Sequence, residues 1–158
     1  MPRGVDNRVG IAYNTIVSVY QVVIDTNVFV TALRSQRGAS YRLLSLINSG
    51  KYQINLSVPL VIEYEAVAKR LVGEITLSAK DVDDILDYTV RLANHWKIHY
   101  LWRPQLKDPS DDMLLELAVA AGCDYIITYN LNDFKGVEQF GIEAITPKEF
   151  LERIGELP

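Results

Sequence analysis

Residues 22–30 read Val-Val-Ile-Asp-Thr-Asn-Val-Phe-Val. The three β-branched residues before Asp25 show no polar alternation, which is typical of a strand buried on both faces of a parallel sheet. Asp25 stands where that strand ends. The carboxyl ends of the strands form the ligand crevice of an open α/β sheet, so a carboxylate here is either a helix cap or a functional group.

The composition predicts a single globular unit. With 158 residues, we expect one domain over residues 15–158, after a flexible tail at residues 1–14. We find no apolar stretch that would span a membrane and no signal-peptide pattern, and a lone cysteine, Cys123, rules out an internal disulfide; together these predict a cytoplasmic protein. A net charge of -4 argues against a general nucleic-acid coat, but not against a nuclease whose bound cations neutralise phosphate.

Apolar, strand-like runs alternate with amphipathic helical segments along the chain. Parallel neighbours need crossover helices, so the pattern predicts an α/β fold with a parallel sheet of about five strands, covered on both faces. The expected strands lie at residues 22–24 with an apolar stretch from Ile16 leading into them, and at residues 53–56, 96–101, 125–128 and 142–145.

Carboxylates lie close to the ends of several expected strands. Each has a structural explanation: Asp25 as a helix cap, Asp108 and Asp111 as the start of a helix, and Asp133 as a turn residue. A parallel sheet brings these strand ends together, however, and two unit charges about 4 Å apart repel by roughly 4 kcal/mol at an effective dielectric near 20. Protons or a divalent cation relieve that repulsion, and an all-oxygen donor set favours Mg²⁺ or Mn²⁺ over Zn²⁺.

Other polar and aromatic residues leave alternatives open. Glu63 and Glu65 share a helix, but residues two apart differ by about 200° around its axis, so only one faces the crevice and periodicity does not choose between them. The two histidines have no Cys or His partner at metal-ligand spacing, and we expect them at the surface or an interface. Trp96 and Trp102 belong either to a dimer face or to the core.

Four segments, in this order, resemble the PIN domain family of nucleases and its VapC-like toxins. They are Val23-Ile-Asp-Thr-Asn27, Glu63 in a mid-chain helix, Asp108-Pro-Ser-Asp111-Asp112, and the stretch from Asp124 to Phe134. The resemblance covers about residues 22–150. It implies a three-layer fold with a five-stranded parallel sheet.

The resemblance also implies a function. It implies a Mg²⁺- or Mn²⁺-dependent ribonuclease that hydrolyses RNA phosphodiester bonds, acting as the toxin of a toxin–antitoxin pair. The implied partners are an RNA substrate, a cognate antitoxin protein and further copies of the chain in a dimer or larger homo-oligomer, with no membrane.

The same resemblance assigns the site residues. Many members carry an acid at the position of Asn130, so Asp133 is the acid available here. Turn chemistry at a strand end explains Thr128, Asn27 and Asn130 equally well. The implied catalytic and metal-binding residues are Asp25, Glu63, Asp111 and Asp133, and the residues expected to support them or bind the cofactor are Asn27, Asp108, Thr128 and Asn130.

Three functions from other classes compete with this one. The first is a non-catalytic PIN-like module that binds RNA or a protein. A nucleotide-binding α/β protein is disfavoured, because no Gly-rich phosphate-binding loop follows a strand. A phosphoryl-transfer domain with Asp25 as nucleophile needs a lysine after a later strand, and Lys107 and Lys135 are poorly placed for that role.

Overall fold

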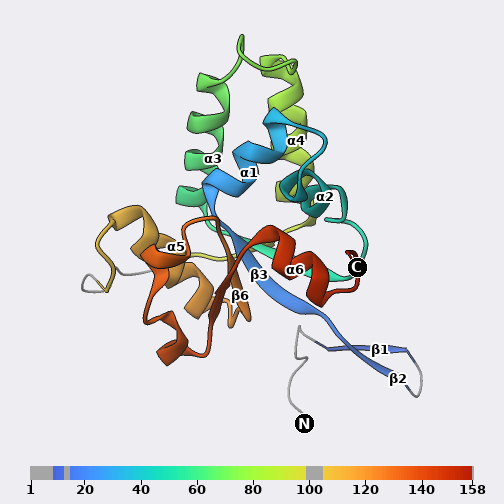
Figure 1. Cartoon of the computed structure of the whole chain (residues 1–158), viewed down its shortest axis with the longest axis vertical. Helices are drawn as coiled ribbons and strands as arrows, with labels where there is room; N and C mark the ends of the chain where they lie inside the picture. Colours follow the sequence, from blue (N-terminus) through green and yellow to red (C-terminus); the bar gives the residue numbers. More distant parts are fainter. Residues whose placement is uncertain (1–8, 13–14, 99–104, 158) are drawn as a thin grey trace.

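The computed structural model describes residues 9–12, 15–98 and 105–157 (Figure 1). A five-stranded sheet lies at its centre, and all of its strand pairs are parallel, in the order β5-β4-β3-β6-β7. The α/β fold predicted from the sequence is therefore confirmed. The strands are β3 (Tyr20–Ile24), β4 (Tyr52–Leu56), β5 (Asn94–His95), β6 (Tyr125–Ile127) and β7 (Glu143–Ile145).

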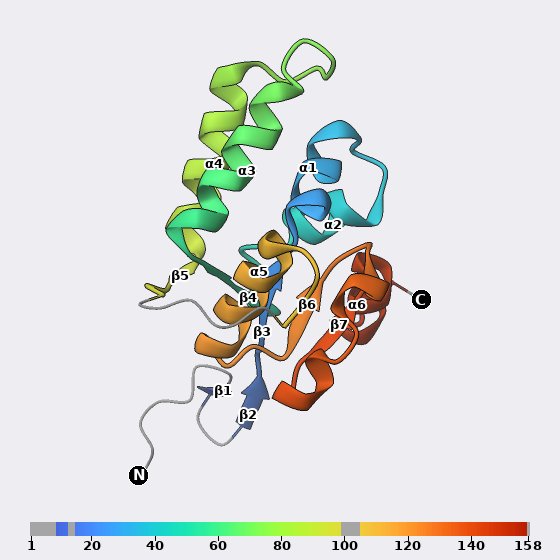
Figure 2. The same cartoon turned by 90° about the vertical axis from the view of Figure 1, so that its left-hand side faces the viewer.

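Helices connect the strands and cover both faces of the sheet. In Figure 1, α5 and α6 lie on opposite sides of the strands, and Phe150 of α6 packs edge-on against Tyr20, Tyr52 and Tyr125. Figure 2 shows α3 and α4 side by side, projecting beyond the sheet. The helices are α1 (Thr26–Arg34), α2 (Ala39–Ser45), α3 (Val58–Arg70), α4 (Ala79–Leu92), α5 (Pro109–Ala120) and α6 (Pro147–Arg153), with 3₁₀ turns η1 (Leu131–Phe134) and η2 (Val137–Phe140).

The helix starts follow local capping chemistry. The Ser57 hydroxyl caps α3, and Ser78 and Asp81 form the predicted capping box at the start of α4. After the C-terminal end of α5, Gly122 adopts the left-handed conformation with φ 63°, which ends the helix before β6. These signals are local in sequence, and they fix where each helix leaves the sheet.

The third strand differs from the expectation of residues 96–101. The structure has a two-residue strand, β5, at Asn94–His95, and the amide of Trp96 donates a last hydrogen bond to the carbonyl of Leu56 at 2.8 Å. Pairing ends there because β4 turns into α3 after Leu56 and leaves no extended backbone to pair with. Residues 99–101 of the expected strand, with His99, and the neighbouring Trp102 lie outside the described residues.

The N-terminal segment also differs in part from the expected tail at residues 1–14. Strand β1 (Val9–Ala12) pairs antiparallel with β2 (Thr15–Ser18). The rest of the expected tail lies outside the described residues. A strand of four residues is too short to establish a period of two in the sequence, so the pattern did not reveal it.

Within the described ranges, no helix is long and apolar enough to cross a lipid bilayer.

Tyr64 links the core to the end of the central strand. Its ring is fully buried and stacks on Phe29 with ring centroids 4.3 Å apart, and its hydroxyl donates to the carbonyl of Ile24. Tyr64→Phe leaves that buried carbonyl without this donor, so we expect the free energy of unfolding to fall by about 1–3 kcal/mol in urea titrations. Tyr88→Phe, at a half-exposed ring, is the control and should change it by less than about 0.5 kcal/mol. Equal stability of the two variants would contradict the assigned role of the Tyr64 hydroxyl.

Candidate active site

Asp25 lies at the carboxyl end of β3, as expected, and the sheet itself fixes its position. Its backbone amide donates to the carbonyl of Ile127 in β6 at 2.9 Å, and its carboxylate accepts a hydrogen bond from the Thr128 hydroxyl at 2.7 Å. Although Asp25 is the N-cap residue of α1, its side chain makes no capping hydrogen bond. The explanation of this carboxylate as a helix cap is therefore not met, and its side chain turns to β6 instead.

The structure distinguishes the two glutamates of α3. Glu63 is half-buried and accepts a hydrogen bond from the hydroxyl of Thr26, the residue after Asp25. Glu65 is exposed and pairs with Lys69 one turn later at 2.9 Å. Only Glu63 therefore faces the end of the central strand.

Three aspartates at the start of α5 differ in what they contact. Asp108 caps the helix by accepting from the Ser110 amide at 2.8 Å, so its structural explanation holds. Asp112 accepts from the amides of Gln105 and Leu106 at 3.0 and 2.9 Å and so holds the preceding loop, a role that the sequence analysis missed. Asp111 caps nothing in the described structure and lines the open crevice.

The pKa of Asp111 reflects the charges of the other expected acids. This pKa is raised to about 7, with burial as the largest cause and the negative charges of Asp25, Asp108, Asp133 and Glu63 as the remaining causes. Asp25, Glu63 and Asp133 come from other segments of the chain than Asp111, and each lies close enough to act on its carboxyl group. These acids are therefore within electrostatic range of Asp111.

Asp25 is perturbed in the same direction. Burial is the largest cause of its raised pKa, the hydrogen bond from Thr128 opposes the shift, and the charges of Glu63 and Asp133 add to it. Asp133, an exposed residue of η1, therefore acts on both Asp25 and Asp111. We conclude that ionising all of these acids together carries a free-energy cost.

An open crevice of about 1040 Å³ runs along the start of α5 and the η1 turn. Charges of both signs line it: those of the acids Asp108, Asp111 and Asp133, and those of Lys107 and Lys135. Acids that hold a cation, beside lysines that attract phosphate, are the combination that a phosphodiester requires.

The donor set fits a hard divalent cation. Every candidate ligand is an oxygen, and the Oδ1 atom of Asn27 is buried without a hydrogen-bond partner, two residues after Asp25. In the side-chain positions described here, no three His, Cys, Asp or Glu residues are arranged to hold a metal ion. The fit therefore rests on donor chemistry and mutual repulsion, and ligation by three of these carboxylates requires them to move closer together.

The polar residues near the strand ends support the carboxylates in different ways. Thr128 is fully buried, and the amide of Asn130 donates to its hydroxyl at 3.0 Å, so Asn130 supports Asp25 indirectly through its backbone. Thr26 was missed as a partner of Glu63, although it lies within the Asp-Thr-Asn segment that drew attention to Asp25. No local sequence signal announced the pairing of Asp112 with the loop before α5.

The family model described as the PIN domain matches residues 21–132, more than half of the chain. No curated protein matches the chain. The matched range includes all of the expected site residues except Asp133.

The raised pKa of Asp111 predicts a pH-dependent stability. Its pKa is about 7 in the folded protein against an ordinary value of 3.8, so the folded state retains a proton that the unfolded state loses, and this group's contribution to stability falls as pH rises through that window. In metal-free buffer at pH 8, we expect Asp111→Asn to raise the free energy of unfolding, by no more than about 1 kcal/mol because solvent screens this partly exposed group.

The matched control is Asp87→Asn on the exposed face of α4, measured by urea titration at pH 4 and pH 8. Its stability should follow that of the unaltered protein at both values. A gain at pH 8 as large as that of Asp111→Asn would mean that overall net charge, and not the crevice, causes the effect.

Proposed function

The chain belongs to the PIN domain family, whose members are typically nucleases, and we propose that it is a ribonuclease that uses Mg²⁺ or Mn²⁺ to hydrolyse RNA phosphodiester bonds. The observation that carries the proposal is the group of acids around Asp111: three from other segments, Asp25, Glu63 and Asp133, together with its neighbour Asp108, all raise its pKa. Such a group of acids lowers stability unless protons or cations neutralise it, so its presence is better explained by a function than by the fold.

The chain's residues divide the work of the proposed site. Asp25 and Asp111 would hold the principal ion, and Glu63 and Asp133 would hold a second ion or ordered water. A bound divalent cation lowers the pKa of water and balances charge on the phosphoryl oxygens.

Supporting groups keep these carboxylates in position. The Thr128 hydroxyl fixes one oxygen of Asp25, and the Thr26 hydroxyl fixes one oxygen of Glu63. Lys107 and Lys135, on the wall of the crevice that Asp111 and Asp133 line, would hold the phosphates on either side of the reacting one.

We also propose the biological setting implied by the resemblance to VapC-like proteins. The chain would act in the cytoplasm as the toxin of a pair, a protein antitoxin would cover the crevice, and copies of the chain would form a dimer or larger assembly. Growth arrest on expression of the unaltered chain, absent with Asp25→Asn, would separate a toxin from a housekeeping nuclease.

One observation favours a second candidate, a PIN domain that binds RNA without cleaving it. Asn130 stands where many members carry an acid, and Asp133, the replacement, is exposed on η1. RNA that binds with Mn²⁺ present but stays intact would favour this candidate over the enzyme.

Asp25→Asn tests the enzyme directly. It preserves the size of the side chain and removes one half-buried charge, so we expect RNA cleavage in Mg²⁺ or Mn²⁺ to fall below detection while the metal-free protein is at least as stable as the unaltered one. Cleavage is followed on labelled RNA and stability by thermal unfolding. Metal-dependent cleavage at the original rate by this variant would rule out the proposed site.

The glutamates of α3 provide a matched pair of variants. Glu63→Gln removes the charge that faces Asp25, so we expect cleavage to fall about 10- to 100-fold or more at limiting metal, with partial recovery at high Mn²⁺. Glu65→Gln removes the same charge from the exposed side of the same helix and should leave cleavage unchanged. Equal losses in the two variants would show that α3 contributes only its overall charge.

A further inference from the structure

Seven large apolar side chains are exposed in the described part of the chain, and three of them are tyrosines. Tyr41 on α2 is 39% exposed, Tyr88 on α4 is 43% exposed, and Tyr129 just after β6 is 43% exposed. An exposed aromatic ring offers a flat apolar face at a small cost in side-chain entropy, and successive bases of single-stranded nucleic acid stack on such rings.

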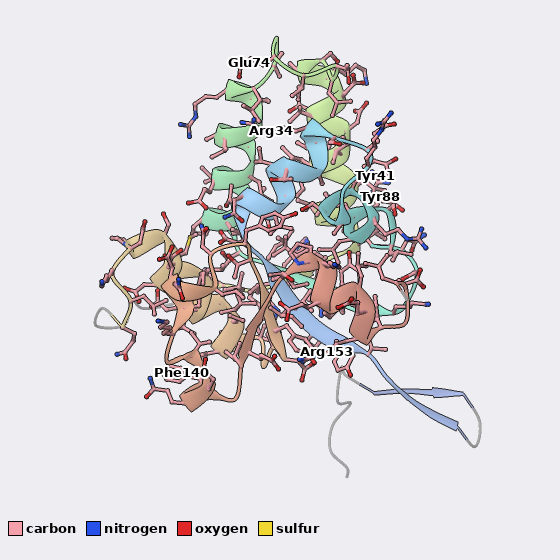
Figure 3. All side chains as sticks on the ribbon, in the orientation of Figure 1. Arg34, Tyr41, Glu74, Tyr88, Phe140 and Arg153 are labelled. Atoms are coloured by element: carbon pink, nitrogen blue, oxygen red, sulfur yellow. The ribbon has the colours of Figure 1, made fainter. Side chains whose placement is uncertain are left out.

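Two of these tyrosines line one cavity. A cavity of about 440 Å³, within the range of small-ligand pockets, lies where the end of α1 meets α2 and α4. Its wall includes Tyr41, Tyr88 and Arg34, and Leu33, Leu77 and Ile85 also line it. Figure 3 shows the labelled tyrosines near one another at the α2 and α4 side of the molecule, with Arg34 at the end of α1.

The charges at this cavity favour an anionic ligand. In the described part of the chain, Arg34 has no carboxylate partner, whereas Arg42 forms an ion pair with Glu156 at 2.5 Å. The one acid of the lining, Asp84, pairs with Lys80 at 3.0 Å. A guanidinium beside two aromatic rings suits a nucleotide, because the rings take the base and the guanidinium takes the phosphate.

A chain of contacts joins this cavity to the candidate active site. Thr128, which donates to Asp25, is followed by Tyr129, whose hydroxyl is hydrogen-bonded to that of Ser40. Ser40 is buried, and the next residue is Tyr41 in the cavity wall. Along α1, the cavity at Arg34 lies roughly 12 Å from the helix start beside Asp25, a distance that a short single strand spans.

We propose that Arg34, Tyr41 and Tyr88 bind an unpaired base and its phosphate from the same RNA strand that enters the acidic crevice, with Tyr129 stacking a base between the two. This inference rests on the proposed function and adds a substrate class, single-stranded RNA longer than the crevice itself. The hydrogen bond between the hydroxyls of Tyr129 and Ser40 holds the Tyr129 ring in place before RNA binds, which lowers the entropy cost of stacking.

Binding is tested with the full chain in metal-free buffer, by fluorescence anisotropy of a labelled single-stranded RNA of roughly 12 nucleotides. We expect Tyr88→Ala and Tyr41→Ala each to weaken binding roughly 5- to 100-fold, since stacking contributes about 1–3 kcal/mol per base. Tyr88→Phe and Tyr41→Phe keep the ring and should bind as the unaltered chain does. Unchanged binding by both alanine variants overturns the proposal.

Two controls separate stacking from general effects. Ile62→Ala removes an exposed apolar side chain, 58% exposed on α3, and should not alter RNA binding. Arg34→Gln should weaken binding and reduce its salt dependence, whereas Arg91→Gln, at an exposed position of α4, should do neither. If the tyrosine variants change the oligomeric state in sedimentation and leave RNA binding intact, the cavity is a protein interface and the proposal fails.

Cleavage distinguishes this inference from the proposed function. With the long RNA, Tyr88→Ala should raise KM and leave kcat nearly unchanged, and with a dinucleotide confined to the crevice it should change neither. Cleavage that ignores the tyrosines overturns the inference alone. If binding depends on the tyrosines but no metal-dependent cleavage occurs, the nuclease function is overturned and the RNA-binding site is supported. If the unaltered chain does not bind RNA, the inference is overturned.

Discussion

The parallel register that pairs Ile24 with Ile127 determines the geometry of the whole site. The residues that follow this pair, Asp25 and Thr128, are thereby placed next to one another, and the hydroxyl of one donates to the carboxylate of the other at 2.7 Å. A shift of one residue in this register would turn the alternate side chains of β6 to the opposite face and remove the donor. The remaining acids then approach a carboxylate that the sheet has already fixed.

Much of this arrangement was predictable from the sequence because its causes are local. The β-branched run before Asp25, the capping box at Ser78 and the Asp-Pro start of α5 each depend on a few neighbouring residues. Convergence of the acids followed from topology alone, since parallel strands end at the same edge.

The features that the sequence did not predict depend on tertiary contacts. Periodicity placed Glu63 and Glu65 on either side of one apolar arc, and only the packing of α3 against α1 brings Glu63 to Thr26. The third strand was expected at residues 96–101 but lies at Asn94–His95, because the point where β4 turns into α3 sets its end. The indole N–H of Trp96 then donates to the side chain of Asn55 at 2.8 Å. Neither partner is close in sequence, so no window of residues contains the information.

An acidic chain that acts on RNA must obtain its affinity locally. With a net charge of -4, long-range attraction for a polyanion is weak or adverse, so in the proposed ribonuclease bound cations and a few lysines would have to neutralise the phosphates next to the reacting bond. Stacking on the exposed tyrosines, as proposed above, would add affinity that does not depend on counterion release. A protein built in this way would hold unpaired RNA by its bases, and its low overall charge would limit non-specific binding to duplexes, whose bases are already stacked.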